Sequence, residues 1–140
     1  MQITRQADYA VRAVLYLAQL GHNEKASTSQ IAEEKDIPLS FLAKIIAQLS
    51  VAGLLQTMRG ARGGVTLARP AKDVNLLEVI EAIDGPILVN ECVNDSYDCS
   101  QHGCPMRGIW QETQADLVKR LRSTTSVSYT HLRAHETKAN

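Results

Sequence analysis

The spacing of apolar residues changes at Gly53, and this change constrains the fold more than any other feature of the sequence. Up to Gly53, apolar side chains recur at three- and four-residue steps, as on one face of a helix. Beyond it, residues 54–58 and 65–68 have the alternating pattern of short strands. The segment between them, 59–64, carries three glycines and two arginines, and glycine accommodates the positive φ angles of a tight turn. The sequence therefore predicts helices followed by a β-hairpin with a basic tip.

Three helices are expected before the hairpin, at about residues 4–20, 27–35 and 39–52. Ile37-Pro38 forces a turn between the last two, because the residue before a proline avoids the helical region. The third helix has four apolar residues at core spacing, Leu42, Ile45, Ile46 and Leu49. Two short helices joined by a tight turn are typical of helix-turn-helix units, which place the second helix in the major groove of DNA.

Two more helices are expected after the hairpin, around an irregular segment. The first covers about residues 76–83 and is ended by Gly85-Pro86, and the second starts near Pro105. The last helix carries a stripe at three- and four-residue steps, formed by Met106, Trp110, Thr113, Leu117 and Leu121. Such a stripe can pack within its own chain, but helix-turn-helix proteins commonly read two half-sites through two-fold symmetry. We therefore expect a C-terminal dimerisation helix.

The predicted fold class is mainly α with a small β-hairpin, in two parts. Residues 1–72 form a winged helix-turn-helix domain, and residues 73–126 form a short helix, a cysteine-bearing loop and the dimerisation helix. Residues 127–140 have no core-forming period and look like the translated read-through of a sequencing adapter, so we expect a non-native tail. No apolar run approaches the roughly 18 residues of a membrane-spanning helix, and the N-terminus has no signal-peptide pattern. A cytoplasmic protein without a membrane partner is expected.

The formal net charge of zero hides an uneven distribution. Residues 37–72 contain five basic side chains and no acidic one, whereas residues 73–116 contain nine acidic side chains and one basic one. The first stretch suits phosphate, and Ser40 and Lys44 lie on the predicted helix face opposite its core, where they can reach bases or phosphates. A helical pair and hairpin that serve packing alone are the alternative. We favour DNA binding because the acid-free stretch coincides with this unit.

Three cysteines, Cys92, Cys99 and Cys104, lie within one irregular segment. Thiolates bind iron-sulfur clusters or zinc, and the spacing lacks the CxxC pair of structural zinc sites, which favours a cluster. Three residues leave a fourth position for His102, for a carboxylate such as Asp8, Asp95 or Asp98, for solvent or for a partner subunit. Unrelated free thiols, or a regulatory disulfide with one spare thiol, are the alternatives. No phosphate loop, dinucleotide fingerprint or hydrolase triad is present, so we do not expect an enzyme.

Four motifs together resemble the BadM/Rrf-type winged-helix regulators. They are the opening Met1-Gln-Ile-Thr with Asp8, Tyr9 and Arg12, the segment 37–45, the hairpin with its flanks at 58–70, and the three spaced cysteines. The resemblance spans Met1 to about Ser126 and implies a homodimeric bacterial transcription factor that binds a palindromic operator in double-stranded DNA. It also implies, as in the iron-sulfur members, a [2Fe-2S] or [4Fe-4S] cluster beside the dimer helix whose loss, oxidation or nitrosylation changes DNA affinity.

The resemblance assigns roles by position. Cys92, Cys99 and Cys104 would be cluster ligands, and Asp8 matches the position from which NsrR-like members donate an oxygen ligand to the other subunit. IscR-like members use a histidine after the third cysteine, but no histidine follows Cys104 before residue 127, and His102 precedes it. The DNA contacts implied by the family are Ser40, Phe41, Lys44, Arg59 and Arg62.

The sequence therefore favours an iron-sulfur-dependent repressor that senses nitric oxide, redox state or iron-sulfur supply. One alternative is a cluster-free winged-helix regulator whose cysteines form a thiol switch or bind zinc. A second alternative is a protein-interaction module whose basic hairpin has no role in DNA binding.

Overall fold

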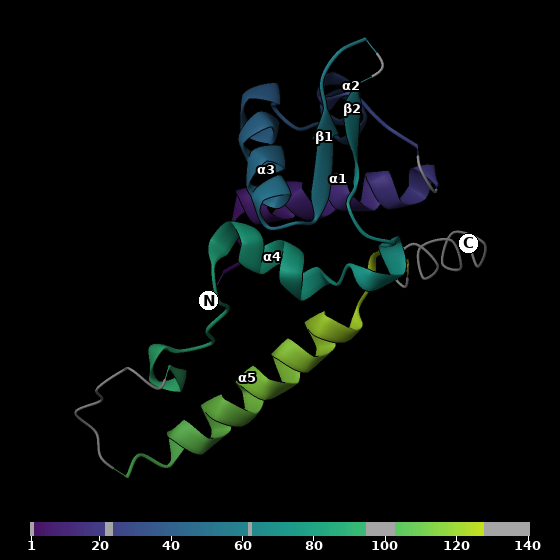
Figure 1. Cartoon of the computed structure of the whole chain (residues 1–140). Coiled ribbons are helices and arrows are strands. Elements are labelled where there is room, and N and C mark those ends of the chain that lie inside the picture. The colour runs from purple at the N-terminus through teal and green to yellow at the C-terminus, as the bar shows by residue number, and fades with distance from the viewer. Residues whose placement is uncertain (1, 22–23, 62, 95–102, 128–140) are drawn as a thin grey trace, which may run out of the picture.

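The helices and the hairpin form in the order that the sequence predicts (Figure 1). The computed structural model describes residues 2–21, 24–61, 63–94 and 103–127. Its elements are α1 (Arg5–Leu20), α2 (Thr28–Lys35), α3 (Leu39–Val51), β1 (Leu55–Met58), β2 (Gly64–Leu67), the short 3-10 helix η1 (Ala71–Asp73), α4 (Leu76–Asp84), the 3-10 helix η2 (Glu91–Val93) and α5 (Met106–Ser123). The predicted class, mainly α with a small hairpin and a C-terminal helix, is confirmed. None of these helices is long and apolar enough to cross a membrane.

Side-chain caps fix where three of the helices begin. Thr4 accepts a hydrogen bond from the backbone N–H of Ala7 at the start of α1, and Ser27 accepts one from Gln30 at the start of α2. At α4, Asn75 and Glu78 form a reciprocal capping box. Each cap satisfies N–H groups that have no partner inside the helix, and such a cap typically stabilises a helix by about 1 kcal/mol.

A backbone bridge connects the hairpin to the segment that precedes α2. β1 and β2 pair antiparallel with Leu55 opposite Leu67. Ala26 adds a bridge to Val65, with a hydrogen bond in each direction at 3.1 and 2.7 Å. Both Ala26 and Val65 are buried. The bridge therefore fixes the hairpin against the chain that leads into α2.

The main hydrophobic core lies between α1, α3 and the hairpin. The four predicted core residues of α3, Leu42, Ile45, Ile46 and Leu49, are all at most 5% exposed. They share a cluster with Ala10, Ala13, Val14 and Leu17 of α1. Because the core side of α1 carries alanines, α3 can lie close to it, and the opposite face of α3 remains in solvent.

A second, smaller core joins α1 and α4 to the C-terminal half of α5. Its buried members are Ala7, Leu77, Ile80 and Ile87, and Leu117, Val118 and Leu121 of α5 pack against them. Two residues of the predicted α5 stripe, Leu117 and Leu121, thus pack partly within the chain. Met106 and Ile109, in the N-terminal half of α5, are 41% and 51% exposed.

The chain after α5 turns back and pairs with the segment that leads into α4. The N–H of Leu76 donates to the carbonyl of Thr124 at 2.8 Å, and the N–H of Ser126 donates to the carbonyl of Val74 at 3.0 Å. We call residues 124–126 the C-terminal strap. Ser126 is 6% exposed, so the strap is part of the folded structure. The expected non-native tail, 127–140, lies outside the described residues except for Val127.

Candidate functional site

The predicted contact residues of α3 lie on its solvent-facing side. Ser40, Phe41 and Lys44 are all exposed, opposite the four buried core residues, and Phe41 keeps 44% of its surface accessible. β1 lies beside α3 and follows it after a short turn, so the beginning of α3 and the tip of the hairpin lie at the same end (Figure 1). The structure thus places the start of α3 and the basic tip of the hairpin at the same end of the domain.

Two arginines of α1 border this face, and neither was predicted as a DNA contact, although Arg12 belongs to the opening motif of the sequence. The rings of Tyr9 and Phe41 are tilted against each other with centroids 6.5 Å apart. The guanidinium groups of Arg5 and Arg12 lie 6.0 and 5.6 Å from the centre of the Tyr9 ring. Their spacing around Tyr9, four residues before and three after, was the available signal.

Glycines set the backbone of the hairpin tip. Gly60 has a φ of 103°, and its carbonyl accepts a hydrogen bond from the N–H of Gly63 at 2.9 Å. A Cβ atom on Gly63 would overlap the carbonyl oxygen of Met58, so this position has room only for glycine. The turn leaves Arg59 exposed, and Arg62 lies outside the described residues.

Two of the three cysteines are described, and both are free, half-buried thiols. Cys92 lies in η2, and Cys104 lies two residues before α5 begins. η2 contacts α5, so both cysteines lie on segments that are close to this helix (Figure 1). Cys99 and His102 lie outside the described residues, as do Asp95 and Asp98. Among the residues that are described, no three ligand-type side chains gather in one place. Two soft thiols close to α5 have the donor chemistry that suits an iron-sulfur cluster or zinc.

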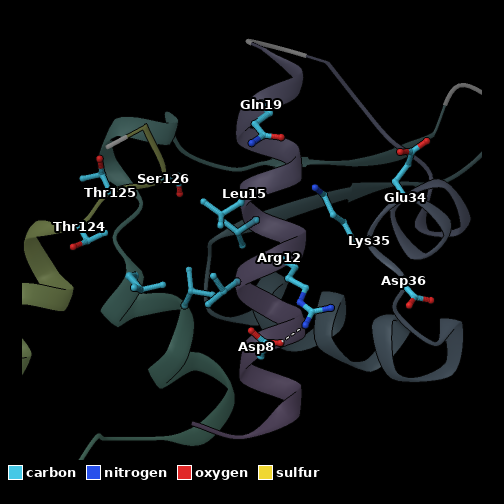
Figure 2. Close-up of a pocket in the computed structure, with 14 residues that line it drawn as sticks. Asp8, Arg12, Leu15, Gln19, Glu34, Lys35, Asp36, Thr124, Thr125 and Ser126 are labelled. Carbon is cyan, nitrogen blue, oxygen red and sulfur yellow. Dashed lines mark ion pairs between the residues drawn. The ribbon is translucent and has the colours of Figure 1, made fainter. Parts of the chain in front are cut away.

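Asp8 lies in the first turn of α1. Its carboxylate is 2.7 Å from the guanidinium of Arg12, and 47% of its side chain is exposed. It lines an open groove of about 470 Å³ along α1, bounded by the end of α2, by α4 and by the C-terminal strap (Figure 2). The same groove exposes charged side chains of both signs, including Lys35 and Glu34. Asp8 is therefore accessible to a second molecule.

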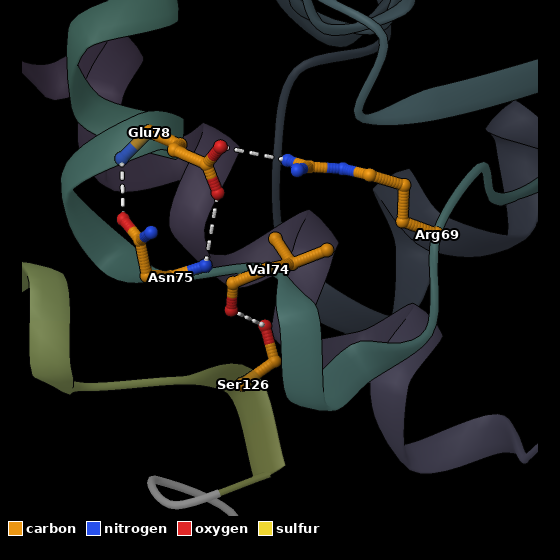
Figure 3. Close-up of polar contacts among 5 residues, drawn as sticks. All are labelled: Arg69, Val74, Asn75, Glu78 and Ser126. Carbon is orange, nitrogen blue, oxygen red and sulfur yellow. Dashed lines mark hydrogen bonds and ion pairs between the residues drawn. The ribbon is translucent and has the colours of Figure 1, made fainter.

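A short series of polar contacts connects the hairpin to the strap (Figure 3). Arg69, two residues after β2, pairs with Glu78 of α4 at 3.0 Å. Glu78 also forms the capping box with Asn75, and the neighbouring carbonyl of Val74 accepts hydrogen bonds from the N–H and the hydroxyl of Ser126. The end of the hairpin, the start of α4 and the end of α5 therefore meet within a few residues.

Comparisons with known proteins identify the family. The chain matches the Rrf2 family, described as an iron-dependent transcriptional regulator, over residues 3–127. The HTH-type transcriptional regulator NsrR of Shouchella clausii (strain KSM-K16) is 30% identical over 127 residues, which cover 89% of this chain and 85% of that protein.

Two solved structures are similar in fold. CymR (YrzC), the global cysteine regulator of B. subtilis, has a TM-score of 0.81 at 20% identity, covering 94% of this chain and 98% of that one. IscR of T. potens has a TM-score of 0.75 at 25% identity, covering 94% and 87%. These comparisons confirm the prediction of a DNA-binding regulator that is not an enzyme. The chain belongs to the Rrf2 family of transcriptional regulators.

Proposed function

We propose that this chain is a homodimeric repressor that binds a palindromic operator and whose DNA affinity is controlled by an iron-sulfur cluster. One observation supports the DNA-binding part: the start of α3, whose outer face is exposed, lies at the same end of the domain as the hairpin tip. Both belong to a stretch of 36 residues without an acidic side chain. Phosphate contacts dominate affinity for DNA, so a basic stretch without acidic side chains favours that ligand.

The DNA contacts are proposed from exposure and position. Ser40, Phe41 and Lys44 would enter the major groove from the start of α3, where a recognition helix contacts base edges. Arg59 and Arg62 would reach the minor groove or its phosphates from the hairpin tip. Arg5 adds positive charge at the edge of the same face. It lies over the Tyr9 ring beside Phe41, together with Arg12, whose charge is paired with Asp8.

The dimer is proposed to form through the N-terminal half of α5. This half presents Met106 and Ile109 to solvent, with Trp110 half-buried, whereas the C-terminal half packs on α4. An apolar helix face of this kind suits a second copy of the same helix around a two-fold axis. A symmetric dimer would also present two α3 helices to two half-sites.

Cys92, Cys99 and Cys104 are proposed to hold the cluster, either [2Fe-2S] or [4Fe-4S]. The fourth ligand would be Asp8 of the partner subunit, with His102 as the alternative. When bound, the cluster would supply iron that reacts with nitric oxide or oxidants. The chain's own residues would turn its presence into a structural change, because ligation would draw Cys92 and Cys104 together at the start of α5 and tie them to α1 of the other copy.

The described thiols also fit a cluster-free regulator. Cys92 and Cys104 are both free and half-buried, a state that also suits a thiol switch or zinc ligands. Metal and sulfide analysis of anaerobically isolated protein distinguishes an iron-sulfur cluster from a thiol switch or a zinc site. Iron with acid-labile sulfide supports the cluster, whereas zinc alone or no metal supports the alternative.

The DNA-binding part is tested by the salt dependence of binding. Duplexes are selected from a random pool, and affinity is titrated at several salt concentrations for the wild type and for Lys44→Ala, Arg59→Ala and Lys119→Ala. Each lost phosphate contact lowers the slope of log affinity against log salt by about 1. Lys119 is exposed on α5 and serves as the charge-matched control. Equal slopes for the wild type, Lys44→Ala and Arg59→Ala would exclude these two side chains as phosphate contacts. The absence of salt-dependent duplex binding would favour the protein-interaction module.

A further inference from the structure

The side chain of Gln114, on α5, holds the segment that follows α4 by two hydrogen bonds to its backbone. Its Oε1 accepts from the N–H of Val89 at 2.9 Å, and its Nε2 donates to the carbonyl of Ile87. The orientation of the amide is fixed by its partners, because the N–H requires an acceptor and the carbonyl requires a donor. We call this pair of bonds the Gln114 clamp.

The clamp replaces the pairing that a neighbouring strand would provide. Residues 85–90 contain neither helix nor strand, yet Ile87 is 7% exposed and belongs to the second core. Backbone polar groups next to a hydrophobic core require partners, and an amide side chain offers a donor and an acceptor side by side. Gln114 therefore allows an irregular segment to lie against α5.

The clamped segment leads directly to the first cysteine. Cys92 comes three residues after Val89, within η2, whose turn is closed by hydrogen bonds from Val93 to Asn90 and from Asn94 to Glu91 at 3.1 and 3.0 Å. η2 itself contacts α5. Cys104 lies two residues before the start of the same helix. Gln114 thus ties the segment that carries Cys92 to the helix that begins beside Cys104.

We propose that Gln114 is a positioning residue for the cysteine site. By clamping Ile87 and Val89, it limits the exposure of Cys92 and keeps it beside α5 before any cofactor is bound. What the cysteines bind rests on the proposed function, but the clamp is a property of the metal-free chain and is tested on that chain.

The test uses the reduced, metal-free full chain and two measurements. Amide hydrogen exchange at Val89 is followed by NMR, and the alkylation rate of Cys92 by N-ethylmaleimide is followed by peptide mass spectrometry. Gln114→Leu removes both bonds, whereas Gln114→Glu keeps an acceptor for Val89 and loses the donor to Ile87. Gln111→Leu changes an exposed glutamine one turn earlier on α5 and serves as the matched control.

Local opening sets both rates. We expect Gln114→Leu to exchange the Val89 amide about tenfold faster and to alkylate Cys92 about threefold faster than the wild type. Gln114→Glu should keep more of the Val89 protection than Gln114→Leu, and Gln111→Leu should match the wild type. Unchanged Val89 exchange and Cys92 alkylation in Gln114→Leu would overturn the proposal. Equal acceleration in Gln111→Leu would also overturn it, since a general loosening of α5 would then be the cause.

If Gln114→Leu does not fold, the proposal is tested with Gln114→Glu alone. Faster Cys92 alkylation in a cooperatively unfolding Gln114→Glu protein supports the clamp, and a wild-type rate refutes it. Failure of the cluster proposal is seen separately, as the absence of iron and sulfide in anaerobically isolated wild type. The two proposals can therefore fail independently.

Discussion

The guanidinium of Arg69 lies 3.0 Å from the carboxylate of Glu78, and this pair connects the end of the hairpin to α4. The carboxylate of Glu78 also accepts a hydrogen bond from the N–H of Asn75. Because the backbone on either side of Asn75 pairs with the C-terminal strap, one acidic side chain lies at the meeting point of the hairpin, α4 and α5. The contacts between the end of α5 and the end of the hairpin therefore run through only a few residues.

Substitutions of Glu78 should separate its two roles. Glu78→Gln keeps the capping bond and loses the ion pair, which is worth at most about 1 kcal/mol because both side chains are more than a third exposed. Glu78→Ala loses both interactions and should lower the free energy of unfolding by about 1–2 kcal/mol. Urea unfolding measures both values. Equal losses for the two variants would mean that the hydrogen bond from the Asn75 N–H to the Glu78 side chain contributes nothing.

Truncation separates the strap from the expected tail. A chain that ends at Val127 should unfold within about 0.5 kcal/mol of the full chain, because the strap is retained. A chain that ends at Ser123 loses both backbone bonds of the strap, each worth about 0.5–1.5 kcal/mol, and should be correspondingly less stable. If both truncations destabilised the protein equally, residues beyond Val127 would belong to the fold.

Asp8 and Arg12 allow a ligand to be distinguished from an ion pair. Asp8→Ala and Arg12→Gln both break the 2.7 Å contact, which as an exposed pair one turn apart is worth only about 0.3–0.5 kcal/mol. Only Asp8→Ala removes the carboxylate proposed to reach the partner's cluster. The decay of visible absorbance after reconstitution should be about tenfold faster in Asp8→Ala and close to wild type in Arg12→Gln. Equal decay in the two variants would assign the effect to the ion pair.

The sequence predicts the parts of this fold that repeat with a period. Leu42, Ile45, Ile46 and Leu49 were found because helical burial recurs at three- and four-residue steps, and all four are buried. The same period could not show which residues of the α5 stripe pack within the chain. Leu117 packs on the second core and Met106 is exposed, although both follow the same three- and four-residue spacing. The use of a helix face depends on what packs against it, and one chain's pattern does not contain that information.

Contacts that involve single residues were missed for a different reason. The bridge between Ala26 and Val65, the strap bridge between Asn75 and Thr125, and the two bonds of Gln114 have no repeat that a pattern could detect. Residue types alone predicted the candidate sites. Lysine and arginine on the third helix and the hairpin indicate phosphate binding, and three closely spaced thiols indicate a metal or cluster site. The role of Tyr9 in bringing two arginines beside Phe41 required the structure.

The central claim is that the state of the cysteine site controls DNA affinity, and one titration tests it most directly. A single anaerobic preparation is titrated with its selected duplex before and after the cluster is removed by a chelator, with absorbance recorded on the same samples. We predict iron-sulfur charge-transfer absorbance and an affinity that falls by about tenfold or more on its loss, a coupling of about 1.4 kcal/mol. A preparation without that absorbance, or with equal affinity in both states, would contradict the account.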